Sequence, residues 1–135
     1  MQKTYRWRTR VRFVDTDASG RIHYTAMFRY FEAAEQEFLR ALGVSFSADP
    51  YRDLGFPRVH VECDFSAPVR FDDEVEIEVS VARVGASSFT LAFVASVMDR
   101  PAAKGKVTIV CVDKDTQRSS PVPEHLAAAL RAYAI

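Results

Sequence analysis

The sequence predicts an α+β domain in which an antiparallel sheet of five to six strands wraps around one long helix. Three observations support this prediction. An apolar stripe at helical spacing runs through residues 24–42, and the residues after it alternate between apolar and polar side chains. Turn residues separate these alternating segments at hairpin spacing, which favours antiparallel pairing of neighbours in the chain. The 135 residues, 48% of them hydrophobic, are enough for one domain with its own core.

The first strand and the helix follow from two different periods. Residues 3–14 alternate aromatic or aliphatic side chains with Lys or Arg, which predicts a strand. A turn at residues 15–21, with Ser19-Gly20 as a breaker, leads to a helix expected from Tyr24 to Leu42 and ended by Gly43. At 100° per residue, one arc of this helix is apolar. It consists of Tyr24, Met27, Phe28, Phe31, Phe38, Leu39 and Leu42.

The rest of the chain predicts strands and a short C-terminal helix. Residues 44–55 are expected to be irregular; period-two alternation then predicts strands at 59–65, 75–81, 89–98 and 106–113. Pro123 favours a short helix near the C-terminus. The strands at 89–98 and 106–113 are apolar on both parities, so both of their faces should be covered. Because one helix covers only one face, we expect the other face to meet another subunit.

Composition argues against several classes of protein. The net charge is zero and no basic stripe is present, which argues against nucleic-acid binding. No apolar run approaches the roughly 20 residues of a membrane span, and the N-terminus lacks the apolar segment of a signal peptide. Cys63 and Cys111 lie in apolar strand segments, so we expect buried, reduced thiols in a cytoplasmic protein without a metal site or other cofactor.

Two carboxylates, Asp15 and Asp17, lie between the first strand and the helix. Asp side chains often stabilise turns by bonding to their own backbone, which is one interpretation of both residues. The other interpretation starts from the helix end, whose first N–H groups lack partners and attract negative charge. A carboxylate placed just before that end can attack a carbonyl or activate water while the helix holds the carbonyl oxygen. Such chemistry suits an activated acyl group such as a thioester.

The stretch VRFVDTDASGRIHYTAMFRYFEAAEQEFLRALG resembles the signature of the 4-hydroxybenzoyl-CoA thioesterase family, which has the hotdog fold. The similarity continues through SAPVRFDDEVEIEVSVARVGASSFTLAF and PVPEHLAAAL, so we expect one hotdog domain over residues 1–135. The resemblance implies an obligate dimer that binds acyl-CoA at the subunit interface. It implies that Asp17 is the catalytic carboxylate, acting as nucleophile or general base, and that the Tyr24 backbone N–H polarises the thioester oxygen. Asp15 is then structural.

This chain departs from the family pattern at two positions. Many members have His where this chain has Tyr24, so any help from an imidazole would come from elsewhere, and the neighbouring His23 is the candidate. Many members have Arg or a small polar residue where this chain has Glu35, which falls inside the apolar arc. A charged carboxylate there needs a partner, either Arg58 or His60 on the facing sheet, or it must be neutral. A slight rotation of the helix, which lets Glu35 reach water, is the alternative.

Several other residues are candidates for contacts with substrate. Glu32 borders the apolar arc and lies either at its rim or in the acyl site. His60 lies on the polar parity of its strand and is either solvated or in contact with substrate. Ser87 and Ser88 either form a hairpin turn or, as the resemblance suggests, contact pantetheine. The phosphates of CoA require basic side chains, and the sequence offers Arg58, Arg83, Arg100, Lys104 and Arg118.

The sequence therefore favours an acyl-CoA thioesterase that forms a homo-oligomer, either a dimer or a tetramer whose sheets pack back to back. A hydratase or dehydratase of the same fold would need a positioned His with a carboxylate partner to move a C–H proton, and no motif here indicates one. A non-catalytic module that binds acyl-CoA or an acyl-carrier protein is the other alternative. It would have no need of Asp17 beside the thioester.

Overall fold

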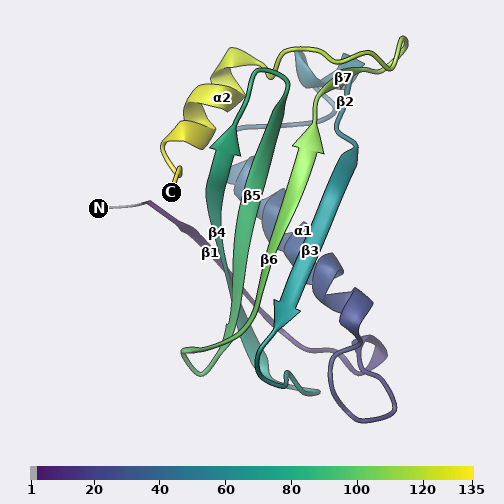
Figure 1. The fold of residues 1–135 in the computed structure, drawn as a ribbon, viewed down its shortest axis with the longest axis vertical. Helices are drawn as coiled ribbons and strands as arrows, with labels where there is room; N and C mark the ends of the chain where they lie inside the picture. Colours follow the sequence, from purple (N-terminus) through teal and green to yellow (C-terminus); the bar gives the residue numbers. More distant parts are fainter. Residues whose placement is uncertain (1–2) are drawn as a thin grey trace.

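A computed structural model, which describes residues 3–135, confirms the α+β hotdog architecture. A five-stranded antiparallel sheet in the order β1-β4-β5-β6-β3 curves around the long helix α1 (Figure 1). Its strands are β1 (Tyr5–Arg10), β3 (Arg58–Phe65), β4 (Glu74–Val84), β5 (Ser88–Val97) and β6 (Arg100–Val110). The helices are α1 (Tyr24–Ala41) and α2 (Glu124–Arg131), and β2 (Leu54–Gly55) pairs with β7 (Val112–Asp113) in a small second sheet. Within residues 3–135, neither helix has the length and apolar character needed to cross a membrane.

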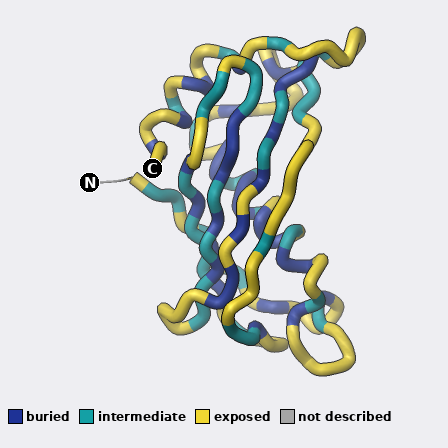
Figure 2. Tube along the Cα trace, viewed as in Figure 1, coloured by how far each residue is buried: buried dark blue, intermediate teal, exposed yellow. Residues whose placement is uncertain are grey.

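The core lies between α1 and the concave face of the sheet, where the buried residues concentrate (Figure 2). Phe31 of α1 stacks on Phe93 of β5, with ring centroids 4.7 Å apart. Gly105 of β6 permits this close approach, because a Cβ atom at that position would lie 2.5 Å from Cε2 of Phe31. Gly43 has a φ of +84°, the left-handed conformation that commonly ends a helix. Of the predicted apolar arc, Met27, Phe31, Phe38 and Leu39 are buried, whereas Phe28 and Leu42 are only partly buried.

Two strand boundaries differ from the prediction for local reasons. β1 ends at Arg10 and not at residue 14, because Phe13–Asp15 forms a single 3-10 turn. β6 begins at Arg100, before the predicted start at residue 106. Met98 and Asp99 both have positive φ and form a two-residue hairpin loop, so pairing resumes at once between Val97 and Arg100.

β3 is an edge strand and is exposed along most of its length (Figure 2). Val59, Val61 and Phe65, which the alternation assigns to the covered face, are 60%, 50% and 46% exposed. Cys63, expected to be buried, is only partly so, whereas Cys111 is buried as predicted. The apolar side of β3 therefore stays largely exposed within a single subunit, because β3 is the edge strand of the sheet.

The convex face of the sheet is more polar than the prediction of two apolar faces implies. Val94 of β5 is only half-buried, and its cross-strand neighbours are Glu78 and Lys104. The hydroxyl groups of Thr90 and Thr108 lie 2.9 Å apart on adjacent strands. On this face, small or apolar residues of β5 lie directly opposite charged residues of the neighbouring strands. Val94, for example, lies between Glu78 of β4 and Lys104 of β6.

Candidate active site

Asp17 lies in the tight loop that precedes α1. Its N–H donates to the carbonyl of Arg21 at 2.9 Å, and its carbonyl accepts a bond from the N–H of Gly20, whose φ is +82°. Its Oδ1 accepts bonds from the hydroxyl and the N–H of Ser19, at 2.5 and 2.8 Å. These bonds lower the pKa of Asp17, so the exposed carboxylate is ionised at neutral pH. Within residues 3–135, Oδ2 has no hydrogen-bond partner.

The N-terminus of α1 adjoins this loop and leaves one N–H free. His23 caps the helix, accepting a bond at Nδ1 from the N–H of Thr25 at 3.1 Å, and its carbonyl accepts one from Ala26. No acceptor within residues 3–135 binds the N–H of Tyr24, which is therefore available at the positive end of the helix. The Tyr24 side chain is 67% exposed and stacks on His23, so placing it in the buried arc was wrong. As the first helical residue, it packs on the cap rather than on the sheet.

Asp15 fastens this loop to the helix. It is buried, and its two carboxylate oxygens accept bonds from Arg29 at 2.5 Å and from the hydroxyl of Tyr30 at 2.8 Å. Its carbonyl accepts a bond from the N–H of His23 at 2.8 Å. Burial alone would raise the pKa of Asp15, but the bonds from Arg29 and Tyr30 and the charge of Arg29 lower it overall. Asp15 is thus fully engaged in holding the N-cap in place.

A hollow of about 200 Å³ brings Asp17 and the first residue of α1 together. Its other wall is the chain that leaves β3, held against the loop by a hydrogen bond of 2.7 Å from the N–H of Ile22 to the carbonyl of Val69. The full lining consists of Asp17, Arg21, Ile22, Tyr24, Phe65, Ala67, Pro68 and Val69. A small group held there would meet a carboxylate and a helix N-terminus at once.

A second hollow of about 240 Å³ lies farther along the seam between α1 and β3. Its lining consists of Phe28, Glu32, Glu35, Arg58, Val61 and Val107. Along α1, Tyr24 borders the first hollow and the later residues border the second, whereas along β3 the order is reversed. The two hollows therefore follow one another along the seam between α1 and β3, which leads away from Asp17.

An ion pair between the buried carboxylate of Glu35 and the partly exposed guanidinium of Arg58 borders the second hollow. Glu35 is 1% exposed, and its carboxylate is paired with the guanidinium of Arg58 at the start of β3. Arg58 also donates to the carbonyl of Phe56 at 2.5 Å, and Glu35 accepts a bond from the side-chain amide of Gln36 at 3.2 Å. Burial raises the pKa of Glu35, and Arg58 partly offsets this effect. The prediction of a buried, paired Glu35 is confirmed, with Arg58 rather than His60 as the partner.

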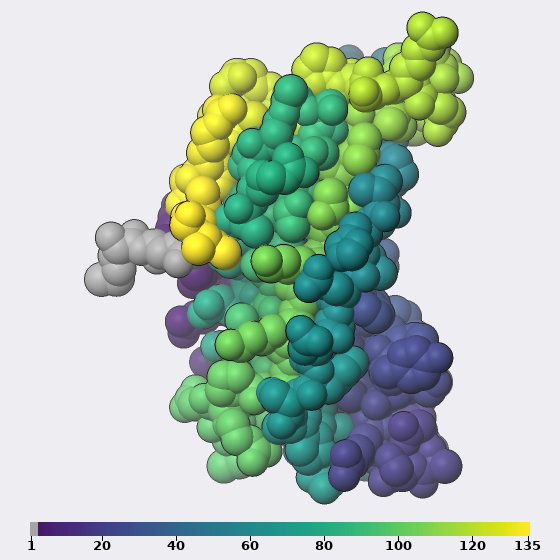
Figure 3. All heavy atoms as spheres, viewed as in Figure 1, coloured from purple at the N-terminus to yellow at the C-terminus, as the bar shows by residue number. Residues whose placement is uncertain are grey.

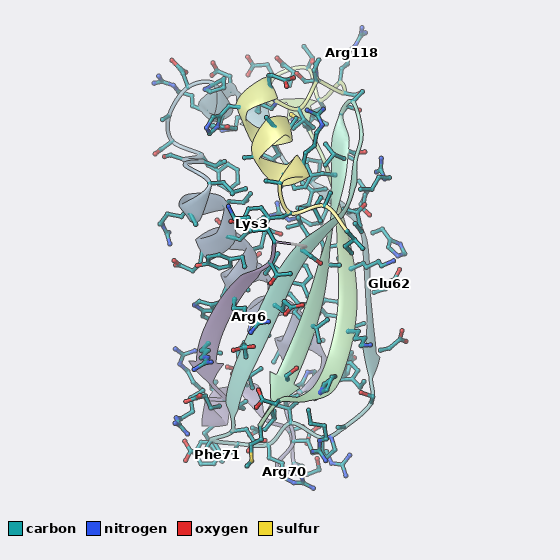
Figure 4. The ribbon with its side chains drawn as sticks, turned by 90° about the vertical axis from the view of Figure 1, so that its left-hand side faces the viewer. Lys3, Arg6, Glu62, Arg70, Phe71 and Arg118 are labelled. Carbon is teal, nitrogen blue, oxygen red and sulfur yellow. The ribbon has the colours of Figure 1, made fainter. Side chains whose placement is uncertain are left out.

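The remaining candidates divide between the seam and other parts of the subunit. Glu32 is an exposed residue on the rim of the second hollow. His60 lines neither hollow. Its side chain is exposed, and its Nε2 lies 2.9 Å from the carboxylate of Glu62. Glu62 points away from α1 on the convex side of the sheet, as Figure 4 shows.

Ser87 and Ser88 belong to the β4–β5 hairpin, at the end of the molecule opposite the loop before α1 (Figure 3). There the carbonyl of Ser87 accepts a bond from the N–H of Cys111 at 2.7 Å, and the hydroxyl of Ser88 accepts one from Arg83 at 2.8 Å. Within one subunit, these serines and His60 therefore do not join the residues around Asp17.

Two parts of the site have weak signals in the sequence. Ser19 supplies both hydrogen bonds to Asp17, and the Asp-x-Ser spacing of a side-chain turn is the signal that identifies it. The segment 65–69 follows an ordinary strand pattern and is distant in sequence, so nothing local marks it as a wall of the site. Arg70 and Phe71, which follow it, lie at the same end of the molecule (Figure 4).

An antiparallel sheet curved around one long helix defines the hotdog fold, and in this chain an exposed carboxylate lies beside the helix N-terminus. The chain belongs to the thioesterase-like superfamily, whose sequence model matches residues 11–130.

Individual relatives agree with this assignment. A 1,4-dihydroxy-2-naphthoyl-CoA hydrolase of Synechococcus elongatus is 29% identical over 125 residues, which cover 90% of this chain and 91% of that protein. A protein of Aquifex aeolicus, provisionally named an esterase, is 32% identical over 127 residues, covering 93% and 96%. The structure of a gentisyl-coenzyme A thioesterase is 30% identical, covers 93% of this chain and 99% of its own, and superposes with a TM-score of 0.84. These relatives confirm the superfamily but do not single out the 4-hydroxybenzoyl-CoA thioesterases within it.

Proposed function

We propose that this chain hydrolyses acyl-CoA thioesters at the hollow beside Asp17. The observation that carries the proposal is the pairing, in one hollow, of an ionised carboxylate with the unpaired N–H of Tyr24 at a helix N-terminus. Ser19 holds Oδ1 of Asp17 in place, while Oδ2 stays free to react. As the thioester carbonyl becomes tetrahedral, its oxygen gains negative charge, which the Tyr24 N–H and the helix dipole stabilise.

Asp17 can act in either of two ways. As a nucleophile, its Oδ2 attacks the carbonyl carbon, the C–S bond breaks with release of the CoA thiolate, and water then hydrolyses the mixed anhydride. As a general base, it takes a proton from a water molecule that attacks the carbonyl, and the thiolate leaves with that proton. Both routes need the ionised form of Asp17 and a donor to the carbonyl oxygen. They differ in whether the protein itself is acylated.

The seam supports an aromatic acyl group that bears a polar substituent. Phe28, Val61 and Val107 provide apolar walls, and the exposed carboxylate of Glu32 at the rim can accept a hydrogen bond from a hydroxyl group. Two of the relatives described above are named for thioesters with aromatic acyl groups, namely 1,4-dihydroxy-2-naphthoyl-CoA and gentisyl-coenzyme A. We therefore infer that hydroxylated aryl-CoA thioesters are the substrate class.

A panel of acyl-CoA thioesters tests this function through the release of free thiol. We expect turnover of hydroxybenzoyl-CoA and hydroxynaphthoyl-CoA without added metal. Binding of these compounds without thiol release would instead indicate a non-catalytic module. Addition of water to an enoyl-CoA without thiol release would indicate a hydratase.

The site implies a second subunit, because the seam is open along β3. The exposed apolar residues Val59, Val61 and Phe65 lie on an edge strand, an arrangement that soluble monomers avoid. We infer that β3 pairs antiparallel with β3 of a second copy about a two-fold axis. This pairing would bring the end that carries Ser87 and Ser88 of one subunit beside the Asp17 end of its partner, where these serines could contact pantetheine. His60 would remain on the convex face.

Assembly can be measured by sedimentation. The wild-type protein should sediment as a dimer or a tetramer at micromolar concentration. Val59→Glu places a charge on the exposed strip of β3 and should give monomers. Val94→Lys, on the convex face, should reduce a back-to-back tetramer to dimers. A monomeric wild-type protein would refute the pairing of β3.

The pH profile of kcat/KM should report the hydrogen bond from Ser19 to Asp17. The Ser19 hydroxyl is the largest cause of the lowered pKa of Asp17, followed by the Ser19 N–H, which Ser19→Ala retains. The variant should raise the pKa of Asp17 toward its ordinary value. Because the ionised form is active, the acid limb should move to higher pH while the plateau changes little. Ser45→Ala, which loses only a contact with the Ser47 hydroxyl, is the control. An acid limb that does not move would show that Asp17 does not control the rate.

A further inference from the structure

We propose that the buried pair of Glu35 and Arg58 is the end wall of the acyl site and limits the length of the acyl group that the enzyme accepts. The inference rests on the proposed function, since the seam must first receive a thioester at Asp17. It adds a specificity-determining element to that function.

The wall stands at a defined distance from the reacting end. The acyl group enters beside Tyr24, and α1 rises about 16 Å from Tyr24 to Glu35 at roughly 1.5 Å per residue. Along β3, the same path runs from Phe65 past Val61 to Arg58. The pair therefore lies at the far end of the second hollow, with the reacting groups at the near end of the first.

The acyl group has no route beneath the helix. Phe31 is 1% exposed and stacks on Phe93, and Gly105 lets it pack directly against the backbone of β6. This contact closes the space between α1 and the centre of the sheet. An acyl group must therefore follow the seam toward Glu35 and Arg58.

The pair is fixed on both sides and resists displacement. Arg58 bonds to the carbonyl of Phe56 as well as to Glu35, and Gln36 bonds to the same carboxylate. A long aliphatic chain that continues along the seam would have to separate the pair, which would leave the buried carboxylate of Glu35 without a partner. A methyl end pressed against the charges would also gain nothing, whereas a hydroxyl end could form hydrogen bonds there. The wall should therefore admit compact acyl groups and exclude long aliphatic ones.

The test removes both charges together. In Glu35→Leu/Arg58→Met, apolar side chains replace the pair, a change that buried ion pairs often tolerate well. We expect the ratio of kcat/KM for dodecanoyl-CoA to that for hydroxybenzoyl-CoA to rise at least tenfold over wild type. The matched control is Glu37→Leu/Arg40→Met, which removes an exposed ion pair from the same helix and should leave the ratio unchanged. If the first variant does not fold, Glu35→Met/Arg58→Met also replaces both charged residues with apolar ones. Its two flexible methionine side chains adapt more easily to the space that is left.

Calorimetric binding of the free acids separates this proposal from the proposed function. Wild type should bind hydroxynaphthoic acid and not dodecanoic acid, and the apolar variant should bind dodecanoic acid, whether or not any thioester is hydrolysed. If the apolar variant folds but still prefers compact acyl groups in both the kinetic and the calorimetric assay, the proposal of an end wall is wrong. A wild-type protein that binds or hydrolyses long aliphatic groups as well as compact ones would overturn it too. A wild-type protein that binds hydroxynaphthoic acid and not dodecanoic acid, but hydrolyses no thioester, would overturn only the proposed function.

Discussion

Asp17→Asn should lower kcat for acyl-CoA hydrolysis by about 10²–10⁴-fold, the range typical of a positioned acid or base, while substrate binding survives. The substitution keeps the shape of the side chain and its ability to accept the two bonds from Ser19. It removes the negative charge that either attacks the carbonyl or takes a proton from water. Because the charge matters only as the transition state forms, the loss should appear in kcat and not in KM.

The experiment needs a matched control and a readout of binding. Asp49→Asn removes a carboxylate from an exposed pair with Arg52 elsewhere in the chain and should leave turnover unchanged. Calorimetry with a slowly hydrolysed substrate should give similar affinities for Asp17→Asn and wild type. If Asp17→Asn keeps more than about half of the wild-type kcat, the mechanism proposed here is wrong. Turnover in isotope-labelled water then separates the two routes, since label incorporated into Asp17 identifies a nucleophile.

Most of the fold was predictable because two periodicities dominate the chain. The stripe of α1 and the alternation in β4 and β5 are each long enough to exclude the other period. The same helical wheel placed Glu35 among apolar residues, which led to the buried pair with Arg58. This success is physical, since a carboxylate at a core position must have a partner wherever the partner comes from.

What the sequence could not supply depends on contacts between distant segments. The hollow at Asp17 needs the chain after β3, and only the folded protein brings it to the loop before α1. The hairpin at Met98 and Asp99 was hidden because neither residue is a glycine, although both adopt positive φ. The alternation of Val59, Val61 and Phe65 predicted a strand but could not show that these side chains stay exposed within one subunit.

Glu35→Ala should destabilise the protein far more than Glu37→Ala, although both remove a carboxylate from α1 that is paired with an arginine. Glu35 is 1% exposed, and its loss leaves the guanidinium of Arg58, whose side chain is 30% exposed, without a carboxylate partner. Breaking a buried pair in this way typically costs about 3–5 kcal/mol. Glu37 pairs with Arg40 on the solvent side, where the two side chains are 42% and 68% exposed, and an exposed pair is worth about 0.2–1 kcal/mol.

Urea denaturation at neutral pH measures both values, and the comparison cancels the effect of helix propensity because each variant exchanges Glu for Ala inside the same helix. Equal and small losses would show that Glu35 is solvated in solution and that its burial beside Arg58 is not maintained. The single variant Arg58→Met and the double variant Glu35→Ala/Arg58→Met complete the cycle. If the cost of Glu35→Ala arises from a stranded charge, removing the guanidinium as well should recover most of the lost stability, whereas a cost that arises from lost packing should persist. Recovery would therefore assign the destabilisation to Arg58 left without its carboxylate.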